Sequence, residues 1–175
     1  MSVKLPVPQP QKIMFKGIFD FDELYRALYD WLVFRGYTFH ERKYKAKSKD
    51  TGKEREISWK AWRRVTDFYK YWFDIHIQAW NIEPIEVNKD GEKKILTKAR
   101  LLIEVKGTIE LDYDDRFETS KFKKALSEFL INFVFKSLID SAWADKLQFM
   151  QYKVLDVVKH NLDMQIKGND HFDVW

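Results

Sequence analysis

Residues 57–79 of the chain read ISWKAWRRVTDFYKYWFDIHIQA. Nearly all odd-numbered positions of this stretch are apolar or aromatic: Ile57, Trp59, Ala61, Val65, Tyr69, Tyr71, Phe73, Ile75, Ile77 and Ala79. Such alternation is typical of a β-strand with one buried face. Only Arg63 and Asp67 interrupt it, so the pattern predicts one long strand or two strands joined by a bend near Asp67. We expect the strand to end at Glu83-Pro84, because proline cannot donate a hydrogen bond to the ladder.

A second alternating segment, residues 95–113, also has its apolar side chains at odd positions, from Leu101 to Leu111. Between the two segments, residues 88–92 read NKDGE, which is a turn signal and predicts a hairpin. If Asn88 and Glu92 close this turn, the numbers of paired residues sum to 180. Residues of equal parity then share a face of the sheet.

This register is supported on both faces of the predicted hairpin. On the apolar face it pairs Tyr71 with Ile109, Phe73 with Gly107, Ile75 with Val105 and Ile77 with Ile103. On the other face it pairs Lys70 with Glu110, Asp74 with Lys106 and His76 with Glu104. An aromatic ring opposite a strand glycine covers the bare backbone, and opposite charges across two strands attract each other.

The N-terminal part of the chain contains a strong helix signal. Asp20 and Glu23 have the spacing of a capping box, and Gly36 is the expected stop, so we predict a helix over residues 21–35. Before it, residues 1–11 contain three prolines and are expected to form an extended tail, followed by a short strand over 12–19. After it, residues 37–49 and 53–65 flank a turn at 50–52 and predict a hairpin.

Beyond residue 115 the apolar period becomes helical and predicts two helices, over 120–139 and 142–163. The sequence therefore predicts an α+β fold with an N-terminal capped helix, a bent antiparallel β-meander of three to four strands, and two long C-terminal helices packed on one sheet face. Residues 12–168 form a single domain in this prediction, and residues 169–175 form a C-terminal tail. The same order of elements also permits a helix-grip arrangement, in which a curved sheet wraps the last helix around a cavity.

Composition excludes several classes of chemistry. The chain has 175 residues and no cysteine, which excludes disulfides, thiolate metal sites and cysteine nucleophiles. The four histidines, His40, His76, His160 and His171, form no HxH or HxxxH pair, so we expect neither a metal site nor a cofactor. No apolar run is long enough to span a bilayer and no signal core precedes the domain, so we expect an intracellular, cytoplasmic protein. The many Lys and Glu residues are typical of thermophilic proteins.

The formal net charge is +4, and it is unevenly distributed. Residues 40–64 contain ten Lys or Arg against four acids, while residues 108–118 contain five acids against one arginine. Both runs are first interpreted as solvated hairpin and strand ends.

The even-numbered positions of the first alternating segment combine bases with large aromatic rings. Lys60, Trp62, Arg64, Phe68, Lys70, Trp72 and Trp80 all lie on this side of the predicted strand. A fully solvated face does not ordinarily carry so many large rings. We therefore predict a non-enzymatic binding or assembly protein that contacts its partner through Lys60, Trp62, Arg64, Lys70 and Trp72.

The favoured partner of this face is another protein or a second copy of the chain. One alternative is a single-stranded nucleic acid, because basic residues interleaved with aromatic rings also bind phosphates and stack on bases. Burial of the face under another part of the chain is also compatible with the pattern.

Two further functions remain open. Residues 103–107, Ile-Glu-Val-Lys-Gly, resemble the (D/E)xK strand of the PD-(D/E)xK nucleases, with Asp74 as the second acid. The resemblance implies a metal-dependent nuclease in which Asp74 and Glu104 hold a divalent metal and Lys106 supports the attacking water. The same residues are also explained as cross-strand charge pairs. The helix-grip alternative would instead imply a carrier of small molecules.

Overall fold

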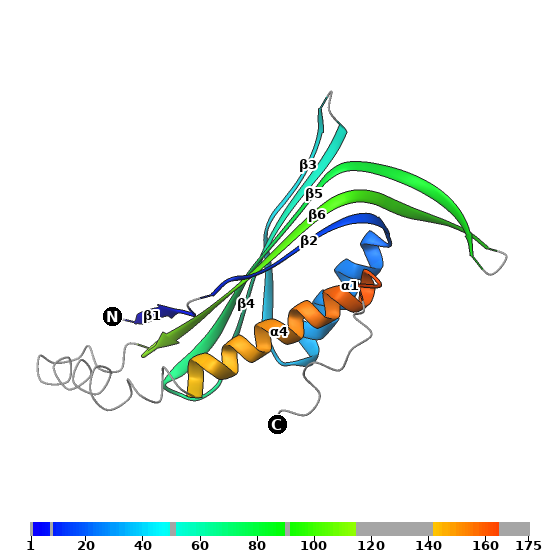
Figure 1. Cartoon of the computed structure of the whole chain (residues 1–175). Helices are drawn as coiled ribbons and strands as arrows, with labels where there is room; N and C mark the ends of the chain where they lie inside the picture. Colours follow the sequence, from blue (N-terminus) through cyan, green and yellow to red (C-terminus); the bar gives the residue numbers. More distant parts are fainter. Residues whose placement is uncertain (1, 8, 50–51, 90–91, 115–141, 165–175) are drawn as a thin grey trace, which may run out of the picture.

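The computed structural model describes residues 2–7, 9–49, 52–89, 92–114 and 142–164. These residues form a six-stranded antiparallel sheet and two helices (Figure 1). In chain order the elements are β1 (Val3–Pro6), β2 (Gln11–Phe19), α1 (Phe21–Phe34), β3 (Thr38–Lys49), β4 (Gly52–Arg64), β5 (Tyr69–Lys89), β6 (Glu92–Leu111) and α4 (Ala144–Asn161). The strand order is β1-β6-β5-β4-β3, and β2 also pairs with β6.

The predicted register of β5 and β6 is confirmed. From Tyr69 opposite Leu111 to Trp80 opposite Arg100, every paired number sums to 180, with Phe73 opposite Gly107. The three polar pairs on the other face, Lys70–Glu110, Asp74–Lys106 and His76–Glu104, are also in register. The parity of the apolar residues therefore does define two faces of the sheet, one buried and one open.

The end of the β5–β6 hairpin differs from the prediction. β5 continues past Pro84, and the hairpin closes with Lys89 opposite Glu92 instead of Asn88 opposite Glu92. A bulge between Trp80 and Glu83 restores the register of the inner part. Pro84 is tolerated because the pairing of β4 with β5 extends only as far as Ile82. The N–H group that Pro84 lacks is therefore not needed for hydrogen bonding on the β4 side of β5.

The long odd-parity stretch consists of two strands, which was one of the two predicted possibilities. β4 ends at Arg64 and β5 begins at Tyr69. In the turn between them, the Thr66 hydroxyl accepts hydrogen bonds from the backbone N–H groups of Phe68 and Tyr69. The residue beside Asp67 thus provides the polar contacts that close the bend.

The capped helix is confirmed as α1. The Asp20 carboxylate accepts a hydrogen bond from the Glu23 backbone N–H at 3.0 Å. Gly36, at φ 75°, has the left-handed conformation expected after the helix.

The fold prediction was wrong in two respects. The sheet has six strands instead of three to four, because β1 and β2 both pair with β6 along its outer edge. Residues 3–6 were assigned to the predicted tail of residues 1–11, but they form β1, which ends at Pro6. The described residues also contain one C-terminal helix, α4, where two were predicted, and the predicted helix 120–139 lies outside them.

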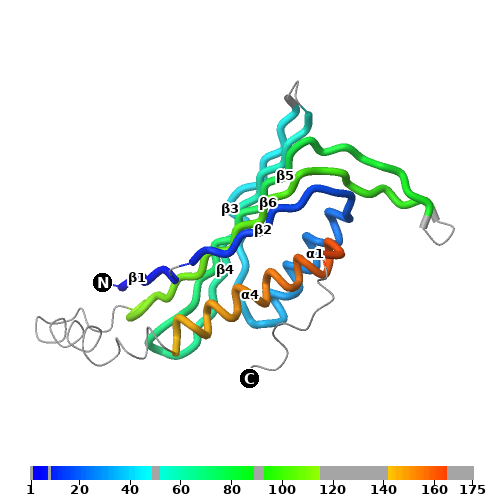
Figure 2. The backbone as a smooth tube through the Cα atoms, viewed as in Figure 1, coloured from blue at the N-terminus to red at the C-terminus, as the bar shows by residue number. Residues whose placement is uncertain are grey.

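Both helices lie on the same side of the sheet, side by side (Figures 1 and 2). The sheet curves over them, and its odd-numbered side chains form the core together with Leu24, Leu28 and Leu32 of α1 and Leu147, Val154 and Val158 of α4. A Cβ atom placed on Gly107 would lie 3.0 Å from the Cγ atom of Leu147. At this point α4 packs directly on the sheet, so no ligand cavity lies between Gly107 and Leu147.

The contact between Gly107 and α4 makes a testable prediction. Gly107→Val should lower the free energy of unfolding by about 1–3 kcal/mol, because the added methyl groups overlap Leu147 and the side chain of Gln151. Urea unfolding measures the change. Thr108→Val is the matched control, since Thr108 lies one residue along β6 and points to the open face. Equal unfolding midpoints for both variants would contradict close packing of α4 at Gly107.

Candidate functional site: the open face of the sheet

We define the outer face as the side of the sheet that points away from the helices. It consists of the even-numbered residues of β5 from Lys70 to Trp80 and of their register partners on the other strands. Eleven of its side chains are basic: Lys4, Lys12, Lys16, Arg42, Lys43, Lys45, Lys60, Arg64, Lys70, Arg100 and Lys106. Four are acidic: Glu56, Asp74, Glu104 and Glu110.

The outer face therefore carries a formal net charge of +7, while the whole chain carries +4. All other residues together sum to −3. The outer face is thus strongly basic although the overall charge is modest, because most acidic residues of the chain lie outside this face.

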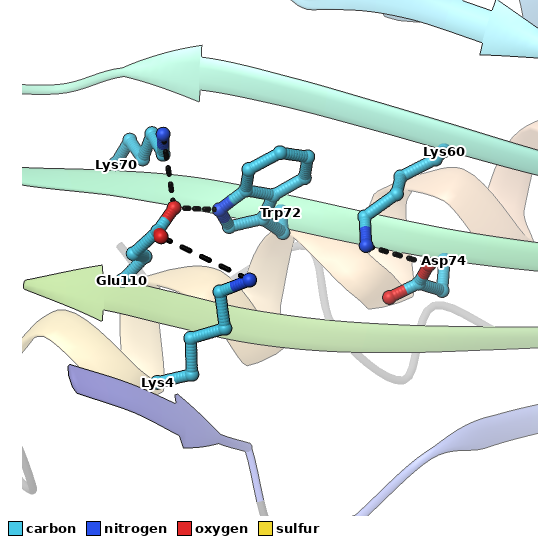
Figure 3. A network of polar contacts seen from close by, with 6 residues as sticks. All are labelled: Lys4, Lys60, Lys70, Trp72, Asp74 and Glu110. Carbon is cyan, nitrogen blue, oxygen red and sulfur yellow. Dashed lines mark hydrogen bonds and ion pairs between the residues drawn. The ribbon is translucent and has the colours of Figure 1, made fainter. Parts of the chain in front are cut away.

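One end of the outer face is organised around Trp72 and Glu110 (Figure 3). The Trp72 indole donates a hydrogen bond to Glu110 Oε2 at 2.6 Å, and Lys70 Nζ lies 2.9 Å from the same oxygen. Lys4 of β1 approaches the other carboxylate oxygen at 3.9 Å. The ammonium groups of Lys60, Lys70 and Lys4 lie 4.7, 5.0 and 5.5 Å from the Trp72 ring centroid. Cations and an aromatic ring therefore stabilise each other here.

Glu110 is the most enclosed charge of this cluster, with an exposed fraction of only 6%. Burial alone would raise the pKa of its carboxyl group, but hydrogen bonds from Lys70, Trp72 and Ser2 outweigh it and hold the pKa below the ordinary value of 4.5. The carboxylate is thus charged in the folded protein and is neutralised by its neighbours.

The structure brings together the five residues predicted to bind a partner. Trp62 lies beside Trp72, with ring centroids 5.3 Å apart. Lys60 bridges to Asp74 at 3.8 Å, and Arg64 lies over the Tyr113 ring at 5.3 Å. Lys60, Trp62, Lys70 and Trp72 are half-buried by one another, while Arg64 is exposed. Three lysines already lie against the Trp72 ring. The main role of Trp72 is therefore to hold this cluster of side chains together.

A shallow groove of about 610 Å³ lies next to this cluster on the outer face. Its lining residues are Arg42, Lys43, Lys45, Ser58, Trp59, Asp74, Ile75, His76, Glu104 and Lys106. The Ser58 hydroxyl and His76 Nδ1 are 3.1 Å apart. The groove spans the middle strands of the sheet, with most of its cations on β3.

A bulge in β3 directs these cations to the outer face. The register with β4 shifts between Glu41 and Lys43, so that Lys43 and Lys45 lie on the side that His40 occupies before the bulge. Glu41 points inward, where its Oε2 atom accepts hydrogen bonds from the Tyr25 hydroxyl at 2.7 Å and the Trp59 indole at 3.1 Å. Burial, together with the hydrogen bond to Glu41, raises the pKa of Tyr25 to about 12, so this phenol stays a donor.

Arg42, Lys43 and Lys45 were not among the predicted site residues, although their charge was noted. The signal that identifies them is a change of parity in the sequence. Phe39 is the last odd-numbered inward aromatic of β3, and the next aromatic, Tyr44, is even-numbered. Such a change within one strand indicates a bulge, and bulges often redirect side chains at functional sites.

The three residues of the predicted nuclease site all line this groove. Each acid, however, has a lysine beside it. Glu104 lies 3.2 Å from Lys12 and 3.5 Å from Lys106, and Asp74 lies 3.8 Å from Lys60. Within the part of the chain that the structure describes, no three His, Asp or Glu side chains gather closely enough to hold a metal ion. Two of these contacts cross between strands, with Lys60 and Lys12 in place of the predicted partners Lys106 and His76, and they favour a structural role for the two acids.

Comparison of the chain with protein-family models and with curated proteins finds no match to either. Of the helices in the described residues, neither has the length and apolar character needed to cross a membrane.

The environment of Glu110 gives a prediction with a pH dependence. Because the folded pKa lies below the ordinary 4.5, the ionised carboxylate stabilises the fold at pH 7, and this contribution disappears as the pH falls below about 4.5. Glu110→Gln should therefore cost about 1–3 kcal/mol at neutral pH, where Lys70 and the Trp72 indole lose a charged acceptor.

Urea unfolding at pH 7 and at pH 3 tests this expectation, and the gap between wild type and Glu110→Gln should narrow in acid. Glu86→Gln, at an exposed position of β5, should leave stability unchanged at both pH values. A gap that stays constant or widens in acid would contradict the role given to the Glu110 charge.

Proposed function

We propose that this protein is a non-enzymatic binding protein that holds an anionic macromolecular partner on the outer face of its sheet. The observation that carries this proposal is the net charge of +7 on that face. A surface with one dominant sign of charge attracts partners of the opposite sign and accelerates their association. The groove and the Trp72 cluster lie together within this surface.

The charge also argues against face-to-face self-association, which the sequence had favoured. Two copies that met through their outer faces would bring together two surfaces of charge +7 each. Like charges juxtaposed at an interface cost several kcal/mol. An acidic protein or a nucleic acid is therefore a better partner for this surface than a second copy of the chain.

A binding role is supported further by the ion pairs that the two acids of the groove form with lysines. Asp74 and Glu104 are neutralised by lysines of neighbouring strands, which leaves the surplus of bases to face solvent. Of these bases, Arg42 forms no ion pair with any residue that the structure describes. A guanidinium group without a partner is available for a carboxylate or a phosphate.

The proposal predicts that reversing charges on this face weakens binding to a generic polyanion. Arg42→Glu combined with Lys45→Glu should weaken binding to heparin roughly tenfold or more at low salt, because two contacts become repulsive. The control is Arg26→Glu combined with Lys146→Glu, which makes the same change in net charge at exposed positions of α1 and α4. Isothermal titration calorimetry of both variants measures the effect.

Circular dichroism confirms that each double variant is folded before binding is compared. Equal losses of heparin binding in the two variants would mean that only total charge matters. In that case the outer face is not the binding surface.

A further inference from the structure

The cations of the groove stand on two sides of a floor whose one acid, Asp74, is paired with Lys60. Arg42, Lys43 and Lys45 lie on β3, and Lys106 lies on β6. These strands are separated by β4 and β5, so the two sides are about 14 Å apart at the usual spacing between strands. Between them, Ser58 and His76 supply a hydroxyl and an imidazole. The arrangement is a channel with charged walls and a polar floor.

The cations on the β3 side are regularly spaced. Lys43, Lys45 and Lys47 are alternate residues of one strand, which places them about 6.6–6.8 Å apart along it. A row of equally spaced charges complements a polymer whose own charges repeat at regular intervals. A nucleic acid carries such a repeat along its whole length, because every nucleotide contributes one phosphate.

Protection of an open sheet edge explains only part of this charge. β3 pairs only with β4 among the described strands, and lysines on an edge strand hinder pairing with another chain. Lys106, in contrast, lies on β6, which has partner strands on both sides. Its 56% exposed side chain on the far wall of the groove does not protect an edge.

The polar groups of this floor are suited to nucleobases. A hydroxyl group donates to and accepts from base edges, and an imidazole ring stacks on an unpaired base. Only a single strand can present its bases to such a floor. A duplex keeps its bases inside, and its major groove admits a helix or a two-stranded ribbon, not the face of a six-stranded sheet.

We infer that the groove lined by Arg42, Lys43, Lys45 and Lys106 binds a single-stranded nucleic acid, with the phosphates on the cations and the bases toward Ser58 and His76. This inference rests on the proposed function and specifies its partner. The acidic protein that the charge would also accommodate becomes an outcome of the test.

The experiment compares three anionic probes by fluorescence anisotropy with the full chain. They are a labelled oligothymidylate of about 20 nucleotides, longer than the ~4–16 nucleotides that one binding domain covers, a mixed-sequence duplex of the same length, and polyglutamate. We expect the single strand to bind at least about tenfold more tightly than the other two, because only it can use both the cations and the floor.

The salt dependence of binding shows where the single strand contacts the protein. For the single strand, Arg42→Gln combined with Lys45→Gln should reduce the slope of log K against log salt by about 1.4, or ~0.7 for each lost phosphate contact. Arg26→Gln combined with Lys146→Gln, on the helices, should leave that slope unchanged. An unchanged slope in the groove variant would overturn the inference, because the nucleic acid would then bind elsewhere.

The remaining outcomes are also decisive. Polyglutamate or duplex binding as tight as that of the single strand would overturn the inference, while heparin binding through the outer face would leave the proposed function standing. If neither heparin nor any of the three probes binds, the proposed function itself fails. Cleavage of the oligonucleotide in the presence of magnesium, lost in Glu104→Gln, would overturn both and identify a metal-dependent nuclease.

Discussion

The structure depends on the pairing of β5 with β6, and within it on Phe73 opposite Gly107. The missing side chain of Gly107 lets Leu147 of α4 approach the sheet closely enough that a Cβ atom would lie 3.0 Å from its Cγ atom. Because this contact fixes which face receives the helices, the odd-numbered residues from Tyr69 to Ala79 of β5 and from Ala99 to Leu111 of β6 become core. The even-numbered residues of these two segments are thereby left on the outer face, where the charges collect.

Parity and capping were predictable from the sequence because they depend on local spacing. The β5–β6 register was right even though its assumed turn was wrong by one residue. The hairpin closes one residue later than assumed, at Lys89 and Glu92, and the bulge at residues 80–83 compensates for this shift. The register itself had been selected correctly by the matched residue pairs on both faces of the sheet. β1 was missed because a four-residue strand beside prolines carries little signal of its own. Its position depends on β6, which pairs with it through residues 108–111, more than 100 residues later in the chain.

The candidate site was predictable to a similar degree. Alternation alone placed Lys60, Trp62, Arg64, Lys70 and Trp72 on one face, and the structure brings them together. The alternation of the sequence could not show that three lysines converge on the Trp72 ring. One of these lysines is Lys4, which lies on the missed strand β1. Regular alternation also did not identify the groove. The bulge after Glu41 changes the parity of β3, so that the odd-numbered Lys43 and Lys45 lie on the outer face. The hydrogen bonds from Tyr25 and Trp59 that hold Glu41 inward come from two other elements.

The surplus of bases on the outer face is not required by the fold. Solubility is satisfied by mixed charges, and the cross-strand pairs of Lys60 with Asp74, Lys70 with Glu110 and Lys12 with Glu104 already provide them. Each further cation adds repulsion to a surface that is already basic, and repulsion of this kind destabilises the compact state. Edge protection accounts for cations on β3 and for Lys12 of β2, which pairs only with β6 among the described strands, but not for Lys106. A net charge of +7 confined to one face is therefore a cost to folding that an anionic partner would offset on binding.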